Sequence, residues 1–149
     1  MAKAPAAPGQ IWQDDCYYLD QQTGECRRKF VVVLAVDGCG DALTAVFTSK
    51  PNGLTENPAC SLGPPRAGYF VGVPGGQFPK PTWVDFSSLE MLDVADLELH
   101  VATGRTRLLN QKVQPPTLCA ILRCLLQSDD ITGREARLLG DIAAALKCP

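Results

Sequence analysis

The segment that decides the fold reads Phe30-Val31-Val32-Val33-Leu34-Ala35-Val36, the longest apolar run in the chain. It is rich in β-branched side chains and apolar at every position, which is typical of a strand covered on both faces. The run is far shorter than the roughly 20 apolar residues that a membrane-spanning helix needs. It therefore predicts the central strand of a buried sheet.

Strand and turn signals continue on both sides of residues 30–36. Residues 10–18 predict an earlier strand, and residues 43–48 predict a third strand, antiparallel to the central one across the glycine-containing turn 37–41. Residues 49–68 are rich in proline, glycine and asparagine. They predict a long irregular loop, a type of segment that is usually functional or disordered.

The next part of the chain predicts shorter elements. Residues 69–73 and 82–86 read as two short strands. Residues 87–90 carry the S-x-x-E spacing of a capping box and predict a helical turn. Residues 97–101 alternate apolar and polar side chains, which favours a half-buried strand that residues 104–109 continue or reverse.

The C-terminal part of the chain predicts two helices. Residues 115–127 begin with two prolines, which the first turn of a helix tolerates, and carry apolar residues at helical spacing. Thr132 and Glu135 form a capping box that opens a second helix, over about residues 132–147. Strands first and helices last predict a mainly β (α+β) domain, a small barrel closed by C-terminal helices.

Length and composition place the chain among ordinary globular domains. The 149 residues are 46% hydrophobic and 20% charged, with a formal net charge of −2, so residues 9–149 predict one domain behind a flexible lead of residues 1–8. The charge excludes a protein that coats polyanions, but it does not exclude a small basic groove. The first residues lack the apolar core of a signal peptide, which predicts a cytoplasmic protein with no membrane contact.

The chain has seven cysteines and a single histidine, His100. No pair of cysteines has the C-x-x-C spacing, so the sequence predicts neither a metal site nor a cofactor. Without an export signal, reduced thiols that are dispensable for folding are expected. Cys16 and Cys26 flank a predicted hairpin turn, where they could face each other.

Several segments, in order along the chain, resemble the sequence pattern of the PemK/MazF/Kid toxin family. They are Gly9-Gln10-Ile11-Trp12, Arg28-Lys29-Phe30-Val31-Val32-Val33, Val46-Phe47-Thr48-Ser49, Trp83-Val84-Asp85-Phe86, and residues 97–106. The resemblance implies an SH3-like barrel that forms a homodimer and pairs with an antitoxin protein. It also implies a metal-independent endoribonuclease that cuts single-stranded RNA. The chain departs from the family at Lys29, where a proline is usual, and at Ala102, near which many members carry an acid.

The resemblance and the chemistry of RNA cleavage together suggest the site residues. Cleavage through the 2′-hydroxyl needs a base, an acid and donors around the phosphorane. Arg28, Thr48 and His100 are the predicted catalytic residues. The predicted RNA-binding residues are Arg27, Lys29, Ser49, Arg105 and Arg107. Each also has an ordinary structural reading, such as a solvated turn, a strand end or a packed histidine.

A second function stays open at this point. Related gyrase poisons use a similar fold and bind a protein target through their C-terminal region, so a non-enzymatic interaction protein on the same barrel is the alternative. A degenerate toxin homologue that only dimerises is a third reading. The observation that separates them is whether Arg28, Thr48 and His100 meet in one groove.

Overall fold

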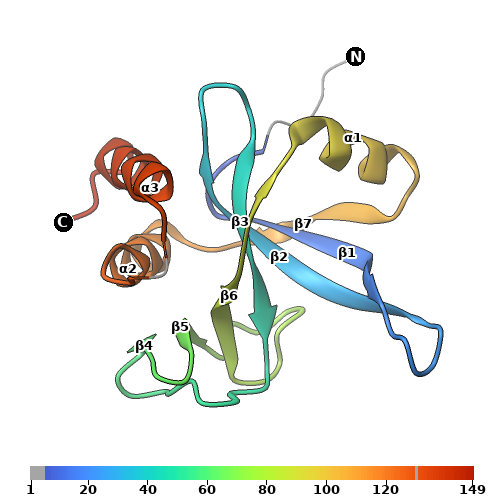
Figure 1. The fold of residues 1–149 in the computed structure, drawn as a ribbon, viewed down its shortest axis with the longest axis horizontal. Helices are drawn as coiled ribbons and strands as arrows, with labels where there is room; N and C mark the ends of the chain where they lie inside the picture. The colour runs from blue at the N-terminus through green and yellow to red at the C-terminus, as the bar shows by residue number, and fades with distance from the viewer. Residues whose placement is uncertain (1–5, 130) are drawn as a thin grey trace.

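The computed structural model describes residues 6–129 and 131–149. Within these residues seven strands form one antiparallel sheet, in the order β4-β5-β6-β3-β2-β1-β7, and three helices accompany it (Figure 1). The strands are β1 (Gln10–Leu19), β2 (Cys26–Val36), β3 (Ala42–Thr48), β4 (Cys60–Leu62), β5 (Ala67–Gly72), β6 (Thr82–Leu92) and β7 (Thr106–Lys112). The helices are α1 (Val94–Ala102), α2 (Pro115–Leu126) and α3 (Gly133–Ala145). The prediction of a mainly β domain with C-terminal helices is confirmed.

Strand β2 is the interior strand that the apolar run predicts. It pairs with β1 on one side and with β3 on the other. Alternate side chains of β2 enter two different cores: Val32 and Leu34 join the larger one, and Val33 joins the smaller one. Because both faces of the strand are covered, an uninterrupted apolar sequence is needed here.

The two cores lie under different helices. Helices α2 and α3 cover the larger core, to which α2 contributes Leu118, Ile121, Leu122 and Leu125. Helix α1 covers the smaller core, where Leu97 packs with Trp12, Val33 and Ala42. In Figure 1 the α2–α3 pair and α1 stand on opposite sides of the central strands.

The two predicted C-terminal helices are present as α2 and α3. The capping box of α3 forms as expected: the Glu135 backbone N–H donates to the Thr132 hydroxyl over 3.1 Å, and the Thr132 N–H donates to the Glu135 carboxylate over 2.9 Å. Both contacts satisfy donors that the first turn of a helix leaves free.

The helical turn predicted at residues 87–90 is wrong, because these residues lie within strand β6. Thr44 pairs with Glu90 and Val46 pairs with Asp85, so β6 bulges between the two pairs. The Ser88 hydroxyl accepts from the Val46 N–H over 2.8 Å and so takes the place of a backbone partner. Ser88 thus accepts a hydrogen bond from a backbone N–H at a bulge in the sheet and does not cap a helix.

The strand predicted at residues 97–101 is also wrong, because these residues belong to α1. The Asp93 carboxylate accepts from the Ala95 N–H over 2.7 Å and caps the helix. Only Leu97 of this helix is buried. His100 therefore lies on a helix, and the late strand of the predicted pattern begins later, as β7.

The long loop predicted at residues 49–68 is interrupted by ordered structure. Strand β4 pairs with β5, which already begins at Ala67. The hydroxyls of Thr55 and Ser61 lie 2.8 Å apart and tie the loop to β4. The remainder of the segment is irregular, as expected.

The prediction of reduced cysteines is wrong, since three disulfides are present. They join Cys16 to Cys26, Cys60 to Cys124, and Cys119 to Cys148, while Cys39 is free and exposed. The first closes the β1–β2 hairpin, where the sequence places the two cysteines face to face. The other two join pairs whose proximity depends on how α2 docks, so spacing along the chain could not indicate them. No described helix has the length and apolar character to cross a bilayer.

Candidate functional site

A basic groove lies where β2 begins and β3 ends, beside the segment that connects β5 to β6. Its volume is about 400 Å³. Its lining residues are Arg28, Lys29, Phe30, Phe47, Thr48, Ser49, Lys50, Gln77, Phe78, Pro79, Lys80 and Thr82. The set contains four cationic side chains and no carboxylate, in a protein whose net charge is −2. Positive charge is therefore concentrated in one place.

The cations of the basic groove are not neutralised by neighbouring acids. Among the described residues, Lys29, Lys50 and Lys80 make no ion pair, and Arg28 contacts only a ring, with Cζ 5.7 Å from the centre of Phe30. Cations without partners attract anions, and a concave surface focuses that attraction. The basic groove is thus suited to binding an anionic ligand.

Three phenylalanines form the floor of the basic groove. The Phe78 ring meets Phe30 at a centroid distance of 5.0 Å and Phe47 at 4.8 Å. Phe47 and Phe78 are buried, whereas Phe30 is partly exposed beneath Arg28. The floor is therefore closely packed, and Phe30 is its partly exposed ring.

The hydroxyls at the end of β3 complete this groove. The Thr48 hydroxyl accepts from the Lys50 N–H over 3.1 Å and so holds the turn in which Lys50 follows the strand. The side chain of Ser49 is exposed. Thr48 thus positions a cation, and Ser49 offers a free donor to an anion.

A second concavity, the α1 pocket, lies where α1 covers β1, β2 and β7. Its volume is about 240 Å³. Its lining residues are Trp12, Asp14, Tyr17, Val31, Val33, Thr44, Glu90, Leu92, Leu97, His100, Arg105 and Thr106. Apolar walls surround a few polar groups, an arrangement typical of small-ligand pockets.

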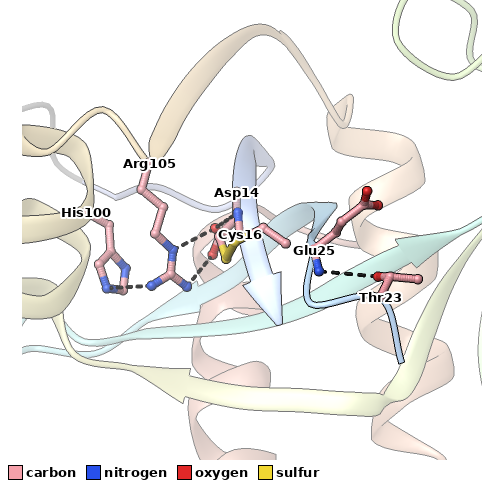
Figure 2. Close-up of a disulfide and its surroundings, with 7 residues drawn as sticks. Asp14, Cys16, Thr23, Glu25, His100 and Arg105 are labelled. Carbon is pink, nitrogen blue, oxygen red and sulfur yellow. Dashed lines mark hydrogen bonds and ion pairs between the residues drawn. A yellow bond between two sulfur atoms is a disulfide. The ribbon is translucent and has the colours of Figure 1, made fainter. Parts of the chain in front are cut away.

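Arg105 is the centre of a polar chain in the α1 pocket. Its Nε donates to Asp14 Oδ1 over 2.9 Å and its Nη2 to Asp14 Oδ2 over 3.1 Å. Figure 2 shows the guanidinium between Asp14 and His100, whose Nε2 lies 3.2 Å from Nη1. The hydrogen bonds to Asp14 raise the pKa of Arg105. Because arginine cannot accept, His100 Nε2 is the acceptor in this contact.

Tyr17 and Glu90 form the other polar edge of the α1 pocket. The Tyr17 hydroxyl donates to Glu90 Oε2 over 3.5 Å, a long contact. Burial raises the pKa of Tyr17, and the nearby Glu90 carboxylate raises it further. Both causes disfavour the phenolate, so the hydroxyl stays a donor at neutral pH.

The Tyr17–Glu90 contact leads to a prediction about titration. Glu90→Gln is expected to lower the pKa of Tyr17, because it removes the negative charge that opposes the phenolate. The pKa should stay above that of a free tyrosine, since burial is the larger cause. The measurement is the phenolate absorbance during a pH titration, with Tyr17→Phe to assign the signal. An unchanged Tyr17 titration in Glu90→Gln would show that the two groups do not interact.

The structure separates the predicted site residues into three places. Arg28, Lys29, Thr48 and Ser49 line the basic groove, His100 and Arg105 line the α1 pocket, and Arg27 and Arg107 line neither. Arg27 donates to Asp20 through Nε and Nη2, and this contact lowers the pKa of Asp20. Arg107 is exposed on β7 opposite Gln13. The three residues predicted as catalytic therefore do not meet in one groove.

Sequence reasoning missed two cations and three polar residues. Lys50 directly follows the hydroxyls predicted at the end of β3, so its position could have been inferred. Lys80 reaches the basic groove only because its loop folds back, which no local pattern indicates. Asp14, Tyr17 and Glu90 likewise meet through the pairing of distant strands.

Among the described residues, no group of three histidine, cysteine or acidic side chains is arranged to hold a metal ion. Comparison of the chain with protein-family models, with curated proteins and with solved structures gives no match.

Proposed function

We propose that this protein binds single-stranded RNA in the basic groove. The observation that carries the proposal is the set of four cations, Arg28, Lys29, Lys50 and Lys80, around one concave surface, none of which pairs with an acid in the described part of the chain. Phosphate contacts by lysine and arginine supply most of the affinity in sequence-independent binding. The arginine adds a planar fork that matches two phosphate oxygens.

The floor of the groove favours a single strand over a duplex. Unpaired bases present their faces to aromatic side chains, and proteins that bind single strands combine such rings with a positively charged groove. Phe30 supplies a partly exposed ring directly below Arg28. The choice of RNA over DNA rests on the resemblance to the toxin family.

The groove supports binding better than cleavage. Its lining contains no histidine, carboxylate or tyrosine, which are side chains that commonly act as general acid or base. His100 lines the other pocket. The groove therefore offers anion contacts without an evident acid and base pair.

The test is a binding titration with a labelled oligouridine about ten nucleotides long, followed by fluorescence anisotropy. Arg28→Ala is expected to weaken binding about tenfold, the scale of one charged hydrogen bond. It should also reduce the slope of the logarithm of the binding constant against the logarithm of the salt concentration by about 0.7, the contribution of one phosphate contact in a single strand.

Arg137→Ala on α3 is the matched control, because this exposed arginine lies on another element and lines neither pocket. It should change neither affinity nor salt dependence. Equal losses for both variants would mean that binding follows overall charge and not the groove. No binding by the wild type would contradict the proposal.

A second candidate function is metal-independent cleavage of the same RNA, as the family resemblance implies. One observation favours it: Arg28 and Thr48, distant in sequence, line the same groove. Incubation of a long single-stranded RNA with the protein in EDTA separates the two functions. Intact RNA supports binding alone, whereas fragments that disappear with Arg28→Ala and Thr48→Val would support the endoribonuclease.

The remaining implications of the resemblance are proposals of the same kind. They are an SH3-like closure of the sheet, a homodimer, an antitoxin partner and a place in the cytoplasm. The C-terminal helices, which the alternative interaction protein would use, pack on the larger core.

A further inference from the structure

The α1 pocket contains polar groups that RNA binding in the basic groove does not use. Glu90, Tyr17 and Arg105 line it from three different strands or their ends. Thr106, which is only 4% exposed, also lines it, and its hydroxyl is buried without a hydrogen-bond partner in the described part of the chain. A buried hydroxyl without a partner is costly, so native proteins rarely keep one without a reason. The residues that line the α1 pocket thus include a buried hydroxyl without a partner.

The charges of the α1 pocket leave one carboxylate uncompensated. Asp14 is neutralised by Arg105 through two hydrogen bonds. Glu90 pairs with no cation among residues 6–129 and 131–149, and its carboxylate makes the long contact to the Tyr17 hydroxyl. A ligand must therefore present hydrogen-bond donors to Glu90.

Arg105 supplies the complementary donors. Its contacts to Asp14 and His100 use Nε, Nη1 and Nη2 once each. A guanidinium has more N–H groups than these contacts occupy. Since the Arg105 side chain is 35% exposed, the free N–H groups can meet acceptors on the same ligand.

We propose that the α1 pocket binds a guanine base of the RNA whose backbone lies in the basic groove, an inference that rests on the proposed function. Guanine places N1–H and N2–H side by side, and these two donors match the two oxygens of the Glu90 carboxylate. Its neighbouring edge carries the acceptors O6 and N7, which match arginine. Bases splayed out of single strands are read in this way, along their edges and on aromatic rings.

The other bases fit this pair of groups poorly. Adenine and cytosine present one amino group beside an acceptor nitrogen, which would face the carboxylate. Uracil presents a single N–H between two carbonyl oxygens. Only guanine joins two adjacent donors to an acceptor edge, so it alone satisfies Glu90 and Arg105 together.

The dimensions of the site allow this arrangement. A volume of about 240 Å³ corresponds to about eight water molecules at the roughly 30 Å³ each takes in the liquid, enough for one purine. Both sites take side chains from β2, with Arg28–Phe30 in the basic groove and Val31 and Val33 in the α1 pocket; Phe30 packs with the larger core and Val33 with the smaller one, so the two sites lie on opposite faces of the strand. At about 3.4 Å per residue, Arg28 and Val33 lie about 17 Å apart along the strand, and because the sites are on opposite faces, the RNA would pass around the sheet to reach both.

The test compares three labelled heptamers: oligouridine, the same strand with a central guanosine, and the same strand with a central adenosine. The wild type is expected to bind the guanosine strand at least about tenfold more tightly than the adenosine strand, the discrimination of one two-pronged base contact. Glu90→Gln should remove this preference and leave the affinity for oligouridine unchanged. Glu90 is exposed, so the variant is expected to fold.

Glu25→Gln is the matched control. It removes the same charge, but Glu25 sits near the tip of the β1–β2 hairpin, and Figure 2 shows its carboxylate pointing away from Arg105 and His100. This variant should keep the preference for guanosine. A loss of the preference in both variants would overturn the proposal, because it would reflect charge and not contact.

The remaining outcomes separate this proposal from the proposed function. Equal affinity of the wild type for the guanosine and adenosine strands overturns the guanine site, while tight binding of oligouridine still supports the basic groove. If no strand binds, RNA binding is contradicted, and calorimetric titration with guanosine decides the pocket. Guanosine binding that Glu90→Gln abolishes supports the site, and no binding overturns it.

Discussion

Replacing Cys60 and Cys124 together by alanine is expected to lower the free energy of unfolding by about 4 kcal/mol. The disulfide joins residues 64 positions apart, and a cross-link across a loop of that length removes much of the entropy of the unfolded chain. Total stabilities of single domains are about 5–15 kcal/mol. The loss should therefore be visible as a large fall in the urea midpoint, with the transition followed by tryptophan fluorescence.

Cys39→Ala is the control for this experiment, because Cys39 is exposed and free. Its stability should stay within about 0.5 kcal/mol of the wild type. A wild-type protein whose urea midpoint is the same with and without a thiol reductant would contradict the prediction, since that result would mean that the bridges do not stabilise the fold.

Leu122→Ala is expected to lower the free energy of unfolding by about 2–5 kcal/mol, the range for removing a fully buried leucine. Leu122 lies on α2 and is 0% exposed, in the core between this helix and the sheet. The substitution removes apolar contacts and leaves a cavity that the β-strands below cannot close. Urea unfolding monitored by circular dichroism measures the change.

The same helix provides the control. Leu126 is one turn later on α2 but is 36% exposed, so Leu126→Ala makes the same chemical change with less buried surface. Its effect should be below about 1 kcal/mol. Equal losses for the two variants would mean that helix propensity, and not burial, determines the cost.

Sequence patterns predicted correctly those strands and helices that are determined by residues within the element itself. Strand β2 was predictable because both of its faces are covered, and α3 because Thr132 and Glu135 cap it reciprocally. Residues 97–101 misled because alternating apolar residues also fit a helix, in which only Leu97 is buried. Residues 87–90 misled because Ser88 bonds across the sheet to Val46. Tertiary contacts decided both cases.

The candidate site likewise contains some residues whose positions could be predicted from the sequence and others whose positions depend on tertiary contacts. Arg28 and Thr48, which the resemblance and the chemistry of RNA cleavage suggested, line the same groove, because the start of β2 and the end of β3 meet wherever the two strands form a hairpin. The positions of Lys80 and His100 could not be predicted in this way. Lys80 reaches the basic groove because its loop folds back, and His100 lies on a helix that the sequence did not predict. The bridge from Cys60 to Cys124 depends on docking between elements far apart in the chain.

The disulfides also determine how the chain would respond to mechanical force. The bridges Cys60–Cys124 and Cys119–Cys148 interlock, because Cys119 lies inside the first loop and Cys148 outside it. Tension applied between the two ends would pass from Cys60 across to Cys124, back to Cys119 and on to Cys148. Helices α1 and α3 and the whole of strands β5, β6 and β7 lie outside this path. With the bridges intact, pulling on the termini would extend the chain without drawing out these elements, among them Glu90, His100 and Arg105 of the α1 pocket.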